Sequence, residues 1–232
     1  MKLKFMKIIA AAGLTLLLST YVALLCVRTR AAASPSDRFT VVIDAGHGGI
    51  DGGVSGITTG VKESELNLDI ARKLKAKFDK SGAKTVMTRK TEAGLYGIYS
   101  KGFKRRDMQK RKQITLNAKA DVFVSIHLNY YSSPSRRGAQ VFYKIDEEKS
   151  KSLADIVQAE LNGGKESERD YTALAGDYYV LNEADCAAIL CECGFLSNAE
   201  DEKLLLTDEY RAEIAEKIFN GIEKYRFSLV DK

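Results

Sequence analysis

The chain holds only two histidines in 232 residues, and both follow short apolar runs. His47 comes after VVIDAG, where the apolar run gives way to glycines, and His127 comes after VFVSI. Ligands of open α/β sheets bind outside the carboxyl ends of the strands. If these runs are neighbouring parallel strands, the two imidazoles lie close together and can bind one divalent ion, for which zinc is the usual choice.

A third ligand is needed, and a carboxylate would complete a His₂Glu set that leaves the fourth position of zinc to water. The segment after His47 offers Asp51, Glu63 and Glu65. We favour Glu63 because it precedes Ser64, the expected N-cap of a helix, where the helix dipole keeps a carboxylate ionised. Glu65 is expected in the first turn, where it supports the start of the helix.

A hydrolytic site also needs a group that accepts and returns a proton. Glu192 interrupts the apolar run AAILCECGF, and a carboxylate at the end of a buried strand is costly unless it has a partner or a purpose. Because side chains alternate along a strand, Glu192 faces away from Cys191 and Cys193. We therefore expect Glu192 to act as general base and then as general acid.

Two other kinds of site are poorly supported. The glycines around His47 do not form a phosphate-binding loop, since no G-x-x-x-x-G-K-[ST] is present and Asp51 stands at the last glycine of a G-x-G-x-x-G frame that starts at Gly46. No serine stands in a G-x-S-x-G elbow, which argues against a serine hydrolase.

Short β-rich runs alternate with longer helical periodicities from Arg38 onward, which is typical of an α/β domain. We expect one three-layer domain with a mixed, mostly parallel central sheet flanked by helices. The run over 138–145 is expected to be an antiparallel or edge strand. Strands are predicted over 38–45, 83–89, 120–127, 138–145, 177–181 and 187–195, and helices over 64–82, 149–162 and 207–229, with a further basic helix before 120.

The N-terminal part of the chain has the features of a membrane segment. Residues 8–27 carry no charge, which is long enough to span a bilayer, and the lysines before them direct the rest of the chain outward. Cleavage after the segment and retention as an anchor both remain open. We therefore expect a signal or anchor over 1–30, a linker over 31–37 and a catalytic domain over 38–232, exported from the cytoplasm.

Charge and cysteine content restrict the function further. Most of the net charge of +5 lies in the first 37 residues, and the remainder has 31 basic and 30 acidic residues, so no nucleic-acid partner is expected. The exported part has three cysteines, Cys186, Cys191 and Cys193, and an odd number argues against a disulfide framework. We expect Cys191 and Cys193 to point into the core.

Five motifs occur in an order and spacing that resemble the zinc-dependent N-acetylmuramoyl-L-alanine amidases of the amidase-3 family: VVIDAGHGG, KESELNL, MTR, ADVFVSIHLN and CECGFLSN. The resemblance covers about residues 39–225. It implies that His47, Glu63 and His127 bind Zn²⁺ and that Glu192 is catalytic. It also implies a substrate, the amide between N-acetylmuramic acid and the L-alanine of the peptidoglycan stem peptide.

Within the family, the N-terminal segment and the stretch LYGIYSKGFKRRDMQKR resemble the sporulation amidases. This resemblance implies a role in spore cortex maturation by the muramic-δ-lactam pathway, in the space between the forespore membranes. It also implies a possible activating accessory protein, since clostridial relatives use a lipoprotein.

Two further residues are predicted to bind substrate. Asn129 stands where some relatives have an acid, two places after the second histidine. The run from Lys101 to Lys112 carries seven basic residues and one acid, and it is either a solvated helix face or a surface for glycan carboxylates or a protein partner. Within this run, Arg111 is the best candidate to contact a substrate carboxylate.

Two alternatives to the amidase remain. A non-catalytic peptidoglycan-binding or scaffold relative could keep the fold, although the complete set of four predicted site residues argues against it. A zinc carboxypeptidase acting within the stem peptide would share the metal chemistry and differ in the bond attacked.

Overall fold

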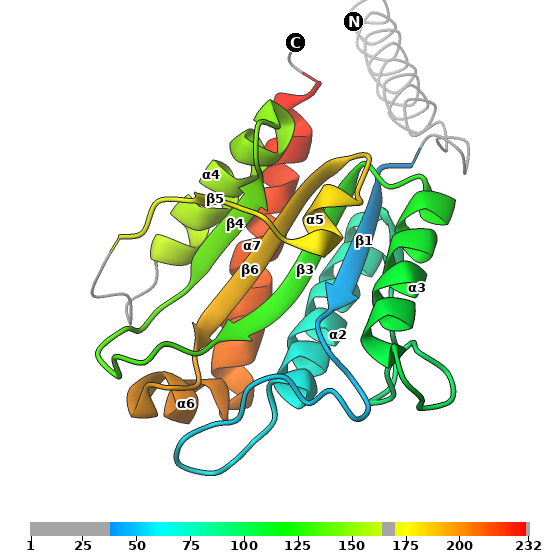
Figure 1. The fold of residues 1–232 in the computed structure, drawn as a ribbon. Coiled ribbons are helices and arrows are strands. Elements are labelled where there is room, and N and C mark those ends of the chain that lie inside the picture. Colours follow the sequence, from blue (N-terminus) through cyan, green and yellow to red (C-terminus); the bar gives the residue numbers. More distant parts are fainter. Residues whose placement is uncertain (1–37, 164–169, 231–232) are drawn as a thin grey trace, which may run out of the picture. The chain divides into compact units, whose positions relative to one another are not determined.

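The computed structural model describes residues 38–163 and 170–230 (Figure 1). The expected signal or anchor segment over 1–30 and the linker over 31–37 lie outside the described residues. No helix in the described ranges is long and apolar enough to cross a membrane.

A six-stranded sheet in the order β2-β1-β3-β6-β4-β5 forms the middle of the fold. Strands β2, β1, β3 and β6 run parallel, and β4 pairs antiparallel with β6 and parallel with β5, which confirms the mixed, mostly parallel sheet. The strands are β1 (Thr40–Ala45), β2 (Lys84–Met87), β3 (Val122–Asn129), β4 (Gln140–Lys144), β5 (Leu174–Gly176) and β6 (Ala187–Phe195).

Helices cover both faces of the sheet, as expected for three layers. Helices α2, α4 and α7 pack on one face over the larger apolar cluster, and α3 and α5 pack on the other face over a smaller one. In Figure 1, α2 and α7 lie behind the sheet and α5 lies in front of it. The helices are α2 (Glu63–Ser81), α3 (Phe103–Ala118), α4 (Glu148–Asn162), α5 (Tyr179–Asn182), α6 (Ala199–Leu205) and α7 (Asp208–Ser228).

Alternation along the central strands divides their side chains between the two apolar clusters. Val41 and Ile43 of β1 belong to the larger cluster and Val42 to the smaller one. The same alternation puts Cys191 and Cys193 fully inside the larger cluster, as predicted, and both are free thiols. A side chain between two such residues must face the opposite side of the sheet.

The strand predicted over 177–181 is wrong. The carbonyl of Tyr178 accepts hydrogen bonds from the backbone N–H groups of Leu181 and Asn182, so this segment forms the single helical turn α5. Aromatic and β-branched residues favour a strand, but here the turn buries Leu181 completely against the smaller cluster. The neighbouring strand β5 lies a few residues earlier.

The start of α2 also differs from the prediction. Lys62, with an extended backbone, is the N-cap, and the helix begins at Glu63, so Ser64 lies within the first turn. Carbonyls of the preceding loop accept hydrogen bonds from the backbone N–H groups of Glu63 and Ser64, at Val54 and Gly52. These carbonyls satisfy two first-turn N–H groups that have no partner within the helix.

Candidate metal centre and cavity

Two buried arginines donate hydrogen bonds to the backbone of the loop that carries His47. His47 has a left-handed backbone with φ of 59°, a conformation that costs a residue with a side chain roughly 1–2 kcal/mol. Arg89 donates to the carbonyls of Ala45 and Gly46, and Arg111 donates to those of Ala45 and His47. These hydrogen bonds fix the backbone that positions the imidazole.

Arg111 also has buried partners that the sequence did not predict. Its guanidinium is 1% exposed and forms ion pairs with Asp44 and Asp107, at 2.5 and 2.6 Å. Arg111 also lines the cavity beside His47, and its predicted contact with a substrate carboxylate stays a prediction. Burial alone would raise the pKa of Asp44, but Arg111 and two hydroxyl groups outweigh burial and lower it.

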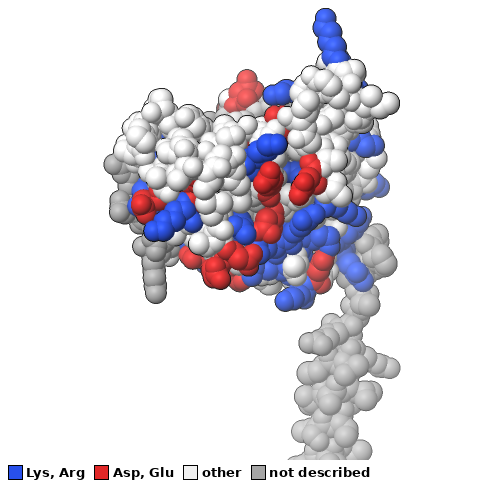
Figure 2. Space-filling model, turned by 90° about the horizontal axis from the view of Figure 1, so that it is seen from below, with Lys and Arg blue, Asp and Glu red and all other residues white. Residues whose placement is uncertain are grey.

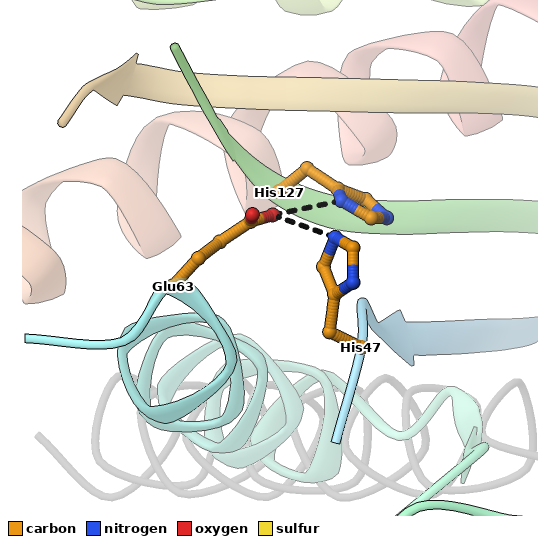
Figure 3. Close-up of side chains that lie close together, drawn as sticks. All are labelled: His47, Glu63 and His127. Atoms are coloured by element: carbon orange, nitrogen blue, oxygen red, sulfur yellow. Dashed lines mark hydrogen bonds and ion pairs between the residues drawn. The ribbon is translucent and has the colours of Figure 1, made fainter. Parts of the chain in front are cut away.

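Glu63, the first residue of α2, points its carboxylate toward both imidazoles (Figure 3). Its Oε1 lies 2.9 Å from Nδ1 of His127 and 3.3 Å from Nε2 of His47. The backbone N–H of Leu128 also donates to Oε1, and that of Val54 donates to Oε2. With 2% exposure, the carboxylate is held in a single orientation by donors from three segments.

The ionised Glu63 and the protonated His47 stabilise each other. Burial alone would raise the pKa of Glu63, but the hydrogen bonds and positive charge of the two imidazoles outweigh it and lower the pKa. Burial alone would lower the pKa of His47, but hydrogen bonds to Asp51 and Glu63 raise it to about 9. Glu63 therefore stays ionised at neutral pH, which is the state a metal ligand requires.

One ligand atom from each of His47, Glu63 and His127 lies within 4.8 Å of the others. Two imidazole nitrogens and one carboxylate oxygen match the donor set of hydrolytic zinc sites. The other two carboxylates considered for this role are placed differently: Asp51 pairs with the far nitrogen of His47, and Glu65 is exposed on α2. The arrangement can hold a divalent cation.

Glu192 of β6 pairs with His127 of β3 in the sheet register and lines the same cavity. Its Oε2 is buried and has no hydrogen-bond partner among the described residues. Burial raises the pKa of Glu192 to about 7, with a further contribution from the negative charge of Glu63, while the two imidazoles oppose the shift. The group is thus suited to gain and lose a proton near neutral pH.

The cavity measures about 400 Å³, within the range of small-molecule sites. Asn129 lines it, and its Oδ1 accepts a hydrogen bond from the backbone N–H of Tyr130. Tyr130, Tyr178 and Tyr179 also line the cavity and were not predicted as site residues. The run DYYVL indicated that Tyr178 and Tyr179 could not both be core residues, because side chains of adjacent residues in the expected strand point to opposite faces.

The basic run between Lys101 and Lys112 does not form one uniform patch. Arg106 donates to loop carbonyls, including those of Tyr96 and Ile98, and Lys112 pairs with Glu183. Figure 2 looks at the end of the molecule where β1, β3 and β6 terminate, and basic and acidic side chains lie side by side there. Arg106 and Lys112 therefore serve local structure, and binding of glycan carboxylates or a protein partner by the run stays a prediction.

Gly46 provides a test of the site geometry. A Cβ at this position would collide with the imidazole of His127, while the backbone φ permits alanine. We expect Gly46→Ala to weaken zinc binding at least tenfold, approaching the loss caused by His127→Ala, with little change in the far-UV circular dichroism spectrum. Chelator competition measures the affinity. Gly163→Ala, where a Cβ has ordinary contacts, is the control, and unchanged affinity in Gly46→Ala would contradict the geometry.

Comparison with known proteins agrees with the family resemblance of the motifs. Residues 41–224 match Amidase_3, described as N-acetylmuramoyl-L-alanine amidase. The chain is 30% identical over 188 residues to the germination-specific N-acetylmuramoyl-L-alanine amidase of Bacillus subtilis, which covers 80% of this chain and 78% of that protein.

Solved structures give the same result. The CwlD amidase from Clostridioides difficile, in complex with the GerS lipoprotein, superimposes with a TM-score of 0.79 and 35% identity, covering 82% of this chain and all of that one. An N-acetylmuramoyl-L-alanine amidase from Clostridium difficile 630 has a TM-score of 0.74 and 33% identity, with coverage of 83% and 98%. The chain therefore belongs to the Amidase_3 family of N-acetylmuramoyl-L-alanine amidases.

Proposed function

We propose that this amidase uses zinc, held by His47, Glu63 and His127, with Glu192 as its catalytic acid–base residue. The observation that carries the proposal is the convergence of the three ligand atoms in one cavity with Glu192, whose buried Oε2 has no hydrogen-bond partner among the described residues. When bound, the zinc ion supplies a Lewis acid that polarises the amide carbonyl and lowers the pKa of water.

The residues of the chain carry the proton transfers. Glu192, ionised, takes a proton from the water whose oxygen attacks the lactyl carbonyl carbon. As the carbon–nitrogen bond breaks, Glu192 returns that proton to the amine of L-alanine, and the products are the free lactyl carboxyl and the released stem peptide. A pKa of about 7 suits both transfers, because the group can be a base in one step and an acid in the next.

The walls of the cavity supply the remaining contacts. Asn129 and Tyr130 line it from the end of β3, and Tyr179 lines it from α5. Half-exposed tyrosines combine an apolar ring with a polar hydroxyl, which suits a substrate made of sugar and peptide. We assign these residues to substrate binding.

The spore cortex is the proposed place of action. Similarity to the germination-specific amidase and to CwlD supports a role in removing stem peptides ahead of δ-lactam formation. The chain would act outside the cytoplasm, between the forespore membranes, held or exported by residues 1–30 with residues 38–232 as the catalytic domain. An accessory lipoprotein is a possible activating partner, since the CwlD structure contains the GerS lipoprotein.

Glu192→Gln tests the mechanism. The amide cannot act as a base, but it has nearly the same shape, so we expect zinc to stay bound while turnover falls at least 10³-fold. Mass spectrometry of digested muropeptides, with and without added zinc, measures the activity. The amidase releases intact stem peptide, a carboxypeptidase would shorten the peptide, and a scaffold protein would change nothing. Full activity in Glu192→Gln would disprove the assignment.

The pH profile tests the raised pKa of Glu192. The base must be ionised, and its pKa is about 7, so the active fraction falls tenfold per pH unit below the midpoint. A bound divalent cation favours the ionised form and lowers this midpoint. We expect kcat/KM to fall as the pH is lowered, with a midpoint no higher than about pH 7. A midpoint well above 7, or a flat profile down to pH 4, would contradict this.

Complementation tests the proposed role in the spore. We expect the full chain, expressed in Bacillus subtilis lacking its germination-specific amidase, to restore muramic-δ-lactam in the cortex. The Glu192→Gln chain is the matched control and should restore none. If purified enzyme is active on peptidoglycan but no lactam returns even with a co-expressed lipoprotein partner, the cortex role is wrong while the amidase chemistry stands.

A further inference from the structure

The two nitrogens of His47 have different partners. Nε2 lies 3.3 Å from the Glu63 carboxylate and thus faces the group of three proposed ligands. Nδ1 lies 3.1 Å from Oδ2 of Asp51, on the other side of the ring. Because the lone-pair directions of the two nitrogens diverge, Asp51 cannot share an ion bound at Nε2 without leaving its place at Nδ1.

Asp51 is held in this place by its own backbone. The N–H of Gly48 donates to the carbonyl of Asp51 at 2.8 Å, and the N–H of Asp51 donates to the carbonyl of Gly48. This reciprocal pair closes a tight turn between the histidine and the aspartate. Lys104, from α3, lies 3.6 Å from Oδ1, the carboxylate oxygen that does not face His47.

This geometry bears on which nitrogen of His47 keeps a proton when a metal binds. A neutral imidazole carries one N–H, and a metal binds only the nitrogen without the proton. An ionised aspartate accepts hydrogen bonds and donates none, so Nδ1 keeps its proton toward Asp51 when a cation takes the place of the proton on Nε2. The lone pair is then on Nε2, which faces Glu63.

We infer that Asp51 is a positioning residue that fixes the tautomer and ring orientation of His47 for metal binding. The inference rests on the proposed function, since it concerns the same zinc site. Outer carboxylates of this kind are common partners of metal-binding histidines, and their removal costs about 10- to 100-fold in metal affinity. Lys104 connects the basic helix α3 to this carboxylate.

The experiment compares Asp51→Ala and Asp51→Asn with the parent, as full chains in detergent. Zinc affinity is measured by chelator competition. We expect Asp51→Ala to bind zinc about 10- to 100-fold more weakly. Asp51→Asn should recover part of this loss, because its amide oxygen still accepts a hydrogen bond from Nδ1. Asp79→Ala, which removes an aspartate from a surface ion pair on α2, is the control and should bind like the parent.

A second measurement separates positioning from general destabilisation. Only two histidines are present, so nitrogen-15 NMR of labelled histidine reports each ring directly. In the zinc-bound parent we expect the proton of His47 on Nδ1 and the metal on Nε2. In Asp51→Ala we expect a mixture of ring states for His47 and an unchanged signal for His127.

The outcomes distinguish this inference from the proposed function. Parent-like zinc affinity and an unchanged His47 spectrum in Asp51→Ala would overturn the inference and leave the zinc amidase intact. A parent chain that binds no zinc would overturn both. Weaker affinity with parent-like His47 signals would mean that Asp51 acts only through folding, which also overturns the inference.

Discussion

The parallel pairing of β1 with β3, and of β3 with β6, is the constraint on which the site depends. It aligns Ala45 with Ile126 and His127 with Glu192, so side chains far apart in sequence meet at one edge of the sheet. A slip of one residue in either pairing would turn every side chain of that strand to the opposite face. The apolar residues on both faces of these strands, divided between two clusters, oppose such a slip. Core packing thus sets the geometry of the polar site.

The loop after β1 has a second requirement, because its backbone leaves the sheet where water is excluded. Buried carbonyls need donors, and an unpaired one costs roughly 1–3 kcal/mol. Arg89 and Arg111 supply these donors, and Asp44 and Asp107 bind Arg111 in turn. Removing one member of such a buried network leaves an uncompensated charge, which typically costs about 3–5 kcal/mol. The network therefore holds the His47 loop in place, and its members Asp44 and Arg111 also line the cavity.

Helices in which apolar residues recur over several turns could be predicted from the sequence, because burial of that apolar face determines where the helix lies. The face of α2 from Leu66 to Phe78 is buried as expected, and the helix ends at Gly82 with the left-handed backbone that glycine allows. The segment around Leu181 could not be predicted in this way, since four residues are too few to show a period and tertiary packing chose the turn.

The residues of the candidate site also differ in whether the sequence alone could predict their roles. His47, His127 and Glu192 could be predicted as site residues, because a polar or charged side chain at the end of a buried apolar strand is costly unless it has a partner or a function. The buried ion pairs of Arg111 could not be predicted, because its sequence neighbours are basic and suggest a surface, whereas its spatial neighbours Asp44 and Asp107 are buried acids. The loop carbonyls that bind the first N–H groups of α2 could not be predicted either, because sequence patterns do not show which carbonyls a fold brings to a helix end.

Two glutamates in one cavity have their pKa values moved in opposite directions by their surroundings. Glu63 receives donors from two imidazoles and two backbone N–H groups, and its pKa falls. Glu192 lies in the same cavity with a buried oxygen that has no partner among the described residues, and its pKa rises to about 7. A pair of carboxyl groups separated in this way can hold different protonation states at one pH. One can remain a permanent anion beside a cation while the other exchanges a proton, so the difference in their hydrogen-bond partners is sufficient to give them different roles.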